Sequence, residues 1–204
     1  MSGKLYVISG PSGAGKGTIC KELAKLTDFY LSISMTTRAP RGSEQNGVEY
    51  FFVTREEFER EIRDGGLLEY AETYGNYYGT PKRKMEEQLS KGRDVVLEID
   101  VKGAAQVREI YPEAVLIFII PPSLAVLRER LAKRGTETEE KIRERLSIVA
   151  REVGEIPKYD YYVINDDLAV AVRDAKAIMD AEKCRVSGRM TDLIERFEEE
   201  EKAL

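Results

Sequence analysis

The 204-residue sequence contains no histidine and only two cysteines. The absence of histidine excludes an imidazole general base, a histidine phosphocarrier and a histidine-containing zinc site. Cys20 and Cys184 are too far apart in the sequence to form a metal-binding motif, and they indicate no disulfide framework. Such sparing use of cysteine is typical of a reducing compartment, so we expect a cytoplasmic protein.

Long apolar segments are also absent. The longest strongly apolar run covers residues 114–122, which is too short to span a bilayer, and the first residues lack the features of a signal peptide. Acidic residues outnumber basic ones by 37 to 32, which gives a formal net charge of −5. We therefore expect neither membrane association nor nucleic-acid binding.

Short apolar runs alternate with helical patterns along most of the chain. This alternation favours an α/β fold with a parallel sheet of five strands, covered by helices on both faces. The expected strands cover residues 5–9, 30–33, 94–99, 115–120 and 161–164, and the expected helices include 101–110, 123–133 and 167–182.

Two segments interrupt this alternation. Residues 35–80 are rich in aromatic residues, arginine, glycine and threonine, and they predict a small inserted β-rich subdomain. Within it, strands are expected at 49–53, 67–72 and 77–78, and a Thr54–Glu57 capping box is expected to open a helix over 54–63.

The second interruption, residues 134–154, predicts a charged helix that opens with a Thr136–Glu139 capping box. A surface segment of this kind is suited to act as a lid, and another charged helix is expected over 185–204. We therefore interpret residues 1–204 as one domain, with a core of residues 1–34, 81–133 and 155–204, an insert of residues 35–80 and a lid of residues 134–154.

A glycine-rich motif follows the first expected strand. Residues 10–16 read G-P-S-G-A-G-K, which matches the phosphate-loop pattern G-x-x-x-x-G-K between a strand and a helix. Glycines let successive N–H groups converge on an anion, and the helix adds its positive N-terminal end. The alternative is a glycine turn with a solvated lysine. We expect a nucleotide phosphate site that comprises Gly10, Pro11, Ser12, Gly13, Ala14, Gly15, Lys16, Gly17 and Thr18.

One position departs from the common form of the motif. Gly17 follows Lys16 where serine or threonine usually binds Mg²⁺, and the nearest hydroxyl is on Thr18. Asp100 follows the apolar strand, at the sheet edge where open α/β sheets bind ligands. It resembles an acid that holds Mg²⁺, mainly through water, although it is also suited to cap the next helix. The side chain of Glu98 either points to the other face of that strand or lies near a pocket for a nucleotide base.

A second anion site is predicted within the insert. Arg38 and Arg41 follow hydroxyl residues, and Pro40 stiffens the segment between them. The planar guanidinium group of arginine matches a pair of phosphate oxygens, and the phenols of Tyr50 and Tyr78 are suited to donate to the same phosphate. The alternative for this segment alone is a solvated turn.

At this point the sequence resembles the guanylate kinase family. The resemblance rests on S-M-T-T-R-x-P-R, G-x-E-Y-F-F-V, L-L-E-Y-A, G-N-Y-Y-G-T, E-I-D, R-G-T-E-T-E-E and V-I-N-D-D-L, which occur in order from about residue 5 to residue 185. It implies a P-loop fold of the nucleoside-monophosphate kinase type. It also implies that GMP is held by Ser34, Arg38, Arg41, Tyr50, Glu69, Tyr78 and Thr80, with Glu98 or Asp100 as further candidates.

The chemistry of Glu69 agrees with guanine as the base. An ionised carboxylate only accepts hydrogen bonds, and guanine presents the donors N1–H and N2–H₂ on its pairing edge. Adenine presents an acceptor at N1, so a buried carboxylate would reject it strongly. Thr80 is suited to donate its hydroxyl to guanine O6, and we also expect it to cap a helix that begins with Pro81.

The lid segment concentrates positive charge. Basic residues outnumber acidic ones over residues 128–151, although the whole chain is acidic. The alternative is a surface helix with ion pairs between neighbouring turns. The resemblance implies that Arg134 and Arg145 neutralise the transferring phosphoryl group, that Arg130 lies nearer the donor, and that Asn165 lies beside the adenine of ATP.

Together these features predict an enzyme that transfers the γ-phosphoryl group of ATP to GMP with Mg²⁺. We expect Lys16, Arg38, Arg134 and Arg145 to be catalytic, because phosphoryl transfer depends on positioning and charge neutralisation. The alternatives are a non-catalytic guanylate-kinase-like module that binds proteins, and a kinase of another nucleoside monophosphate. The sequence leaves open whether the protein is a monomer or a homo-oligomer.

Overall fold

In the computed structural model, residues 3–73, 75–133, 139–186 and 189–203 are described. Two sheets organise the chain. The core sheet has the strand order β2-β7-β1-β8-β9, with all neighbours parallel, and the insert sheet has the order β4-β3-β6-β5. The core sheet consists of β1 (Leu5–Ser9), β2 (Tyr30–Leu31), β7 (Val95–Glu98), β8 (Val115–Ile120) and β9 (Tyr161–Ile164).

The insert sheet is mixed. Strand β3 pairs parallel with β4 and antiparallel with β6, which in turn pairs antiparallel with β5. Its strands are β3 (Met35–Thr36), β4 (Phe51–Phe52), β5 (Leu67–Thr73) and β6 (Asn76–Pro81).

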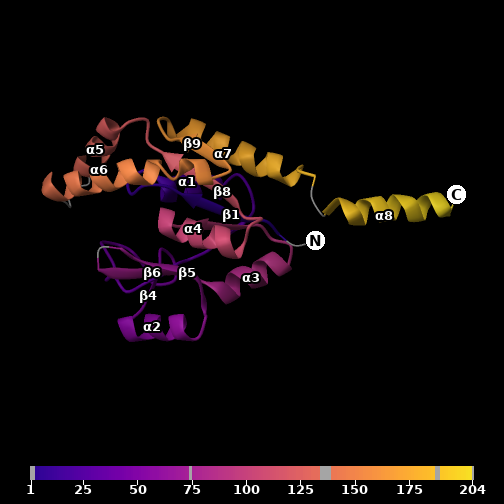
Figure 1. The fold of residues 1–204 in the computed structure, drawn as a ribbon, viewed down its shortest axis with the longest axis horizontal. Coiled ribbons are helices and arrows are strands. Elements are labelled where there is room, and N and C mark those ends of the chain that lie inside the picture. Colours follow the sequence, from indigo (N-terminus) through magenta and orange to yellow (C-terminus); the bar gives the residue numbers. More distant parts are fainter. Residues whose placement is uncertain (1–2, 74, 134–138, 187–188, 204) are drawn as a thin grey trace.

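Helices connect the strands and cover both faces of the core sheet (Figure 1). They are α1 (Lys16–Leu23), α2 (Arg55–Arg63), α3 (Lys82–Ser90), α4 (Val101–Ile110), α5 (Leu124–Lys133), α6 (Glu139–Val153), α7 (Leu168–Lys183) and α8 (Arg189–Lys202), with a 3₁₀ turn at Ile156–Lys158. The insert sheet and α2 lie on the α4 side of the core, whereas α8 extends away from the body.

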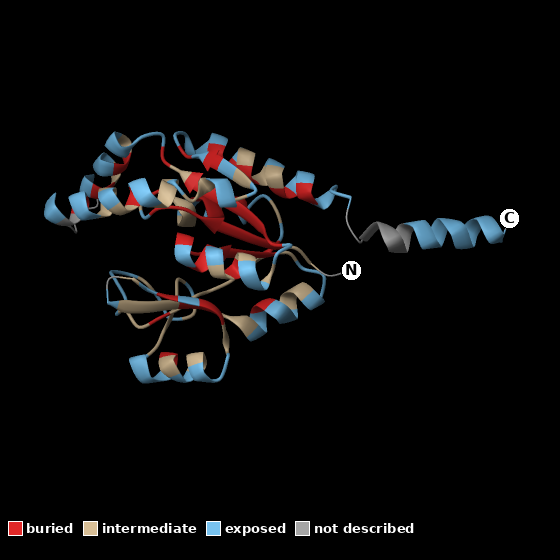
Figure 2. Ribbon diagram, in the orientation of Figure 1, coloured by how far each residue is buried: buried red, intermediate tan, exposed pale blue. Residues whose placement is uncertain are grey.

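The core sheet divides the apolar interior into two clusters. Tyr6 and Ile8 of β1 point to one face, where they pack with residues of α1 and α7. Leu5 and Val7 point to the other face, where α3 and α4 lie. Successive strand residues alternate between faces, so a strand that is apolar throughout fits a sheet buried on both sides. The buried strands between exposed helix surfaces are visible in Figure 2.

The structure confirms the predicted α/β architecture. β1, β8, β9 and α4 have the predicted bounds, and Thr54 with Glu57 forms the predicted capping box at the start of α2. β2 and β4 are shorter than predicted, and β6 is longer. Thr136 of the second predicted capping box lies outside the described residues. Among the described residues, no helix has the length and apolar character needed to cross a membrane.

The predicted role of Thr80 as a helix cap is wrong. Pro81 ends β6 and occupies the cap position of α3, and no side chain caps that helix. Thr80 is a fully buried residue of β6, and its hydroxyl donates to the carboxylate of Glu69 at 2.7 Å. The first N–H of α3, that of Lys82, donates instead to the carbonyl oxygen of Gly66 at 2.9 Å, while the buried carboxylate of Glu69 takes the Thr80 hydroxyl as its donor.

Candidate active site

The glycine-rich loop connects β1 to α1. Gly10 has φ 135° and Gly15 has φ 91°, a region that glycine adopts without strain. A Cβ atom at Gly10 would also collide with the carbonyl oxygen of Ile119. The N-terminus of α1 has no side-chain cap, so its free N–H groups remain available to an anion.

Lys16 is the first residue of α1 and folds back over the loop. Its Nζ donates to the carbonyl oxygens of Gly10 at 2.6 Å and Pro11 at 3.1 Å. Burial lowers the pKa of Lys16, while the negative charges of Glu98, Glu152 and Asp100 oppose that shift. The structure therefore brings the loop lysine together with both carboxylates that the sequence singled out.

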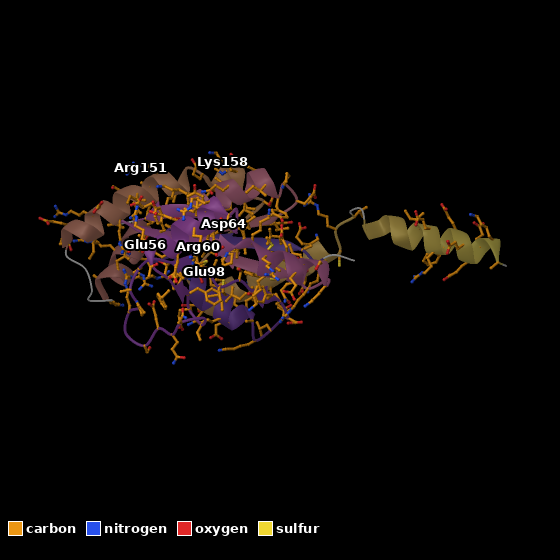
Figure 3. The ribbon with its side chains drawn as sticks, turned by 90° about the horizontal axis from the view of Figure 1, so that it is seen from below. Glu56, Arg60, Asp64, Glu98, Arg151 and Lys158 are labelled. Carbon is orange, nitrogen blue, oxygen red and sulfur yellow. The ribbon has the colours of Figure 1, made fainter. Side chains whose placement is uncertain are left out.

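Glu98 and Asp100 lie at the carboxyl end of β7. Burial raises the pKa of Glu98, and the charge of Lys16 opposes this rise. A Cβ atom at Gly17 would lie 3.2 Å from both carboxylate oxygens of Glu98. Residue 17 therefore lies directly against the carboxylate of Glu98. Glu98 is labelled in Figure 3, where it lies over the main body of the molecule, away from α8.

Asp100 caps α4, as one of its two predicted roles requires. Its Oδ1 accepts from the backbone N–H of Gly103 at 2.8 Å, and its Oδ2 accepts from the hydroxyl of Thr73 at 3.2 Å. Its charge acts on the pKa values of both Lys16 and Glu69. The Asp100 carboxylate therefore interacts electrostatically with the glycine-rich loop and with the insert. Its metal-binding role stays a prediction.

Arg38 is surrounded by aromatic rings and a carboxylate. Its guanidinium carbon lies 5.4 Å from the ring centroid of Tyr50, and the Tyr50 and Tyr78 centroids are 6.0 Å apart in an edge-to-face arrangement. The structure therefore places these three predicted residues together. Burial, and after it the charge of Glu98, raises the pKa of Tyr50 to about 12, so its phenol keeps its proton as a donor.

Glu44 is a residue that the sequence interpretation missed. Its two carboxylate oxygens accept from Nη1 and Nη2 of Arg38 at 3.0 and 3.1 Å, and the backbone N–H of Arg41 donates to it at 2.7 Å. A carboxylate that takes both arms of an arginine resembles a phosphate in geometry and charge. The side chain of Arg38 is only 9% exposed, whereas Arg41 is exposed and Ser34 is half-buried. The acidic residue close after two arginines was the available sequence signal.

Glu69 is buried on β5, where its side chain is in contact with β6. It is 4% exposed, and its Oε1 accepts from the Thr80 hydroxyl. Burial raises the pKa of Glu69 to about 7; the Thr80 hydrogen bond opposes this rise, and the charge of Asp100 adds to it. The two residues that were predicted to contact the base, Glu69 and Thr80, are therefore hydrogen-bonded to each other.

Of the three arginines that the resemblance assigns to the transferred phosphate and the donor, the structure describes Arg130 and Arg145. Arg145 of α6 donates to the hydroxyl of Ser12 in the loop at 3.1 Å. Arg130 of α5 donates to the carbonyl oxygen of Asn165 at 2.9 Å, and the Asn165 amide donates to the carbonyl oxygen of Ala14 at 2.7 Å. Asn165 thus supports the loop, while its predicted contact with adenine stays a prediction. Arg134 lies outside the described residues.

A glycine-rich loop that follows the central strand of a parallel sheet, with a cluster of Arg38, Tyr50 and Tyr78 on an inserted sheet, is typical of a P-loop kinase of the nucleoside-monophosphate type. Comparison with known proteins identifies the family. The family model described as guanylate kinase matches residues 2–182, so the chain belongs to the guanylate kinase family.

Individual relatives agree with this assignment. The chain is 53% identical over 192 residues to a guanylate kinase of Clostridium tetani, covering 94% of this chain and 92% of that protein. It is 54% identical over 199 residues to a guanylate kinase of Caldanaerobacter subterraneus subsp. tengcongensis, covering 97% and 96%. The crystal structure of guanylate kinase from Anaplasma phagocytophilum superposes with a TM-score of 0.77 at 35% identity, covering 91% of this chain and 88% of that one.

Proposed function

We propose that each of the two sheets of the chain carries one of its two nucleotide sites. As a guanylate kinase, the chain phosphorylates GMP with ATP. The loop over residues 10–18 would hold the phosphates of ATP, and the insert of residues 35–80 would hold GMP. An oxygen of the GMP phosphate attacks the γ-phosphorus, the bond to the bridging oxygen of ADP breaks, and GDP and ADP result. The attacking oxygen is already anionic near neutral pH, so no histidine base is needed.

The barrier to this reaction is repulsion between two anions. In this proposal Lys16, Arg38, Arg134 and Arg145 would supply the positive charge that offsets this repulsion. Arg41, Tyr50, Tyr78 and Ser34 would complete the cage for the GMP phosphate, while Arg130 and Asn165 would support the ATP site. The contact of Arg145 with Ser12 supports the lid assignment of residues 134–154, because it brings α6 to the phosphate loop.

The observation that carries the choice of base is the buried Glu69–Thr80 pair. A carboxylate enclosed at 4% exposure has to find donors, and guanine supplies two of them on one edge. The hydroxyl of Thr80 donates to Glu69 in the structure, and we propose that it turns towards guanine O6 when GMP binds. Adenine would leave the carboxylate facing an acceptor, which is the kind of mismatch that gives strong discrimination.

The donor set at the end of β7 suits Mg²⁺. Magnesium prefers oxygen ligands and keeps several waters, and Asp100 and Glu98 supply carboxylate oxygens beside Lys16. We propose that Asp100 holds the ion through water, with the exposed Thr18 hydroxyl as a second candidate. When bound with ATP, the ion would neutralise charge on the β- and γ-phosphates.

We further propose that the enzyme works in the cytoplasm, which supplies ATP and GMP. The free thiols of Cys20 and Cys184 support a reducing compartment. The partners that we propose are ATP and GMP, and neither a nucleic acid nor a membrane.

The deciding test is a coupled assay of ADP production with ATP, Mg²⁺ and one acceptor at a time. We expect rapid turnover with GMP and at most trace activity with AMP, dTMP or UMP. Comparable turnover with any second acceptor would contradict the base assignment. The same assay without an acceptor measures wasteful ATP hydrolysis, which a lid should suppress.

A further inference from the structure

The face of α4 that meets β5 carries two residues outside the proposed nucleotide sites. We propose that Gly103 and Gln106 are positioning residues, which hold the Glu69 carboxylate and its strand where guanine is read. This inference rests on the proposed role of Glu69. Gly103 and Gln106 are three residues apart, so they lie on the same side of the helix.

Gly103 makes room for the carboxylate. A Cβ atom at this position would collide with Oε2 of Glu69 and would lie 3.0 Å from its Cδ. Gly103 is buried inside α4, and its φ is not in the left-handed region. The backbone therefore does not require glycine, and the helix disfavours it relative to alanine. The space that Glu69 occupies is the reason for glycine here.

Gln106 binds the backbone next to Glu69. Its Nε2 donates to the carbonyl oxygen of Tyr70 at 2.8 Å, and its Oε1 accepts from the N–H of Tyr70 at 3.2 Å. β5 is the last strand in the order of the insert sheet, so its outer backbone groups face no neighbouring strand within the described part of the chain. The side-chain amide takes the place of that strand and ties β5 to a core helix.

The strand itself is irregular at this point. Leu67 pairs with Pro81 and Tyr70 pairs with Gly79, so β5 contains one extra residue between these pairs. Successive side chains of a regular strand point to opposite faces, yet Leu68 and Glu69 are both buried. Leu68 packs in the core cluster with Met85 and Val107. The bulge thus directs both side chains inward, and such bulges re-aim side chains near functional sites.

Glu69 is therefore held from three directions. The Thr80 hydroxyl donates a hydrogen bond to its Oε1, and the missing Cβ of Gly103 leaves space for its Oε2. The side-chain amide of Gln106 is hydrogen-bonded to the backbone of the next residue, Tyr70. The N–H of Gly103 also donates to Asp100, which links this arrangement to the carboxylate beside Lys16. The α4 face thereby connects guanine selection to the core sheet.

The test compares Gly103→Ala and Gln106→Leu with wild type in steady-state kinetics and thermal unfolding. We expect Gly103→Ala to lower kcat/KM for GMP about 100-fold, the scale of a 1 Å misplacement, with the KM for ATP unchanged. The helix propensity of alanine opposes the cost of crowding the carboxylate, so we expect a much smaller change in melting temperature than in GMP use. For Gln106→Leu we expect a loss of about tenfold in kcat/KM for GMP.

The matched control is Ala105→Gly, an exposed position of the same helix. It should lower the melting temperature and leave the KM for GMP unchanged, which separates helix stability from positioning. The sharper readout is a double-mutant cycle, because Gly103→Ala should have no further effect on GMP use in a Glu69→Ala background. If Gly103→Ala does not fold, Gln106→Leu in both backgrounds decides the matter in the same way.

The outcomes separate this inference from the function on which it rests. Additive effects in the cycle, or an unchanged kcat/KM for GMP in both single variants, would overturn the positioning role while Glu69→Gln still impairs GMP use. An unchanged KM for GMP in Glu69→Gln would overturn the role of Glu69 itself, and the inference with it.

Discussion

The core sheet and the insert sheet are built from different kinds of residues. β1 is mostly apolar and is buried along its whole length, and parallel pairing on both sides holds it in place. β3 has two residues, and hydroxyl side chains stabilise it: Thr36 donates to the carbonyl oxygen of Tyr77, and Thr37 accepts from the N–H of Tyr77.

This difference corresponds to a division of labour. The core sheet presents a glycine loop and Lys16 to phosphate, a chemistry that is common to many nucleotides. The insert sheet contains the buried Glu69 and Thr80, whose hydrogen-bonding groups distinguish one base from another. Burying such groups weakens an isolated subdomain, so it depends on the core through Leu68 and Gln106.

The largest expected effect concerns the core sheet. Lys16→Ala should lower kcat by about 10³-fold or more, the scale of a cation that neutralises the transferring phosphoryl group. The fold should survive, because the half-buried Lys16 amine has a lowered pKa, so its charged form contributes little stability. The measurement is kcat at saturating GMP, together with circular-dichroism melting.

Lys25→Ala is the matched control for this prediction. Lys25 follows α1, is exposed and pairs with Glu22, so its removal should leave kcat unchanged. Full activity in Lys16→Ala would show that the glycine loop is not the phosphate site.

A smaller effect is expected at the anion cluster of the insert. Arg38→Ala should weaken GMP binding by about 1–3 kcal/mol, the scale of a charged hydrogen bond, and should leave the KM for ATP unchanged. Arg38→Lys keeps the charge but loses the paired N–H groups, so it should restore only part of the affinity. Isothermal titration with GMP measures both, and equal affinity in all three proteins would remove Arg38 from the phosphate cage.

The smallest expected effect is on pH dependence. With a pKa of about 7, Glu69 is largely protonated in the free protein below neutral pH, and guanine requires its ionised form. The KM for GMP should therefore be flat in alkaline solution and should rise below about pH 7, approaching tenfold per pH unit.

The GMP phosphate itself titrates near pH 6, so the comparison must include Glu69→Gln. In that variant the rise that begins near pH 7 should disappear, and only the phosphate titration should remain. Identical profiles for the two proteins would exclude Glu69 as the titrating group.

The two sheets also differed in how far the sequence predicted them. The bounds of β8, β9 and α4 follow from local apolar patterns, and the start of α2 follows from Thr54 and Glu57, which are close in the chain. Sheet pairing and the α3 start depend on distant residues. Threonine is a common helix N-cap, so the local sequence predicts that role for Thr80. In the fold its hydroxyl donates instead to Glu69, which lies on the neighbouring strand β5.

The predicted site shows the same limit. Arg38, Tyr50 and Tyr78 come together, as do Lys16, Glu98 and Asp100. Glu44, Gly103 and Gln106 were missed, because a carboxylate on an arginine, a missing Cβ and an amide on a strand edge acquire meaning only from their neighbours. The roles of the site residues in binding remain predictions until the variants are measured.

The most direct test of base selection by the insert is the ratio of kcat/KM for GMP to that for AMP in wild type and Glu69→Gln. We expect this ratio to fall by about 100-fold or more in the variant, with the KM for ATP changed less than about twofold. An unchanged ratio, with the variant folded and active, would contradict the claim that one buried carboxylate chooses the purine.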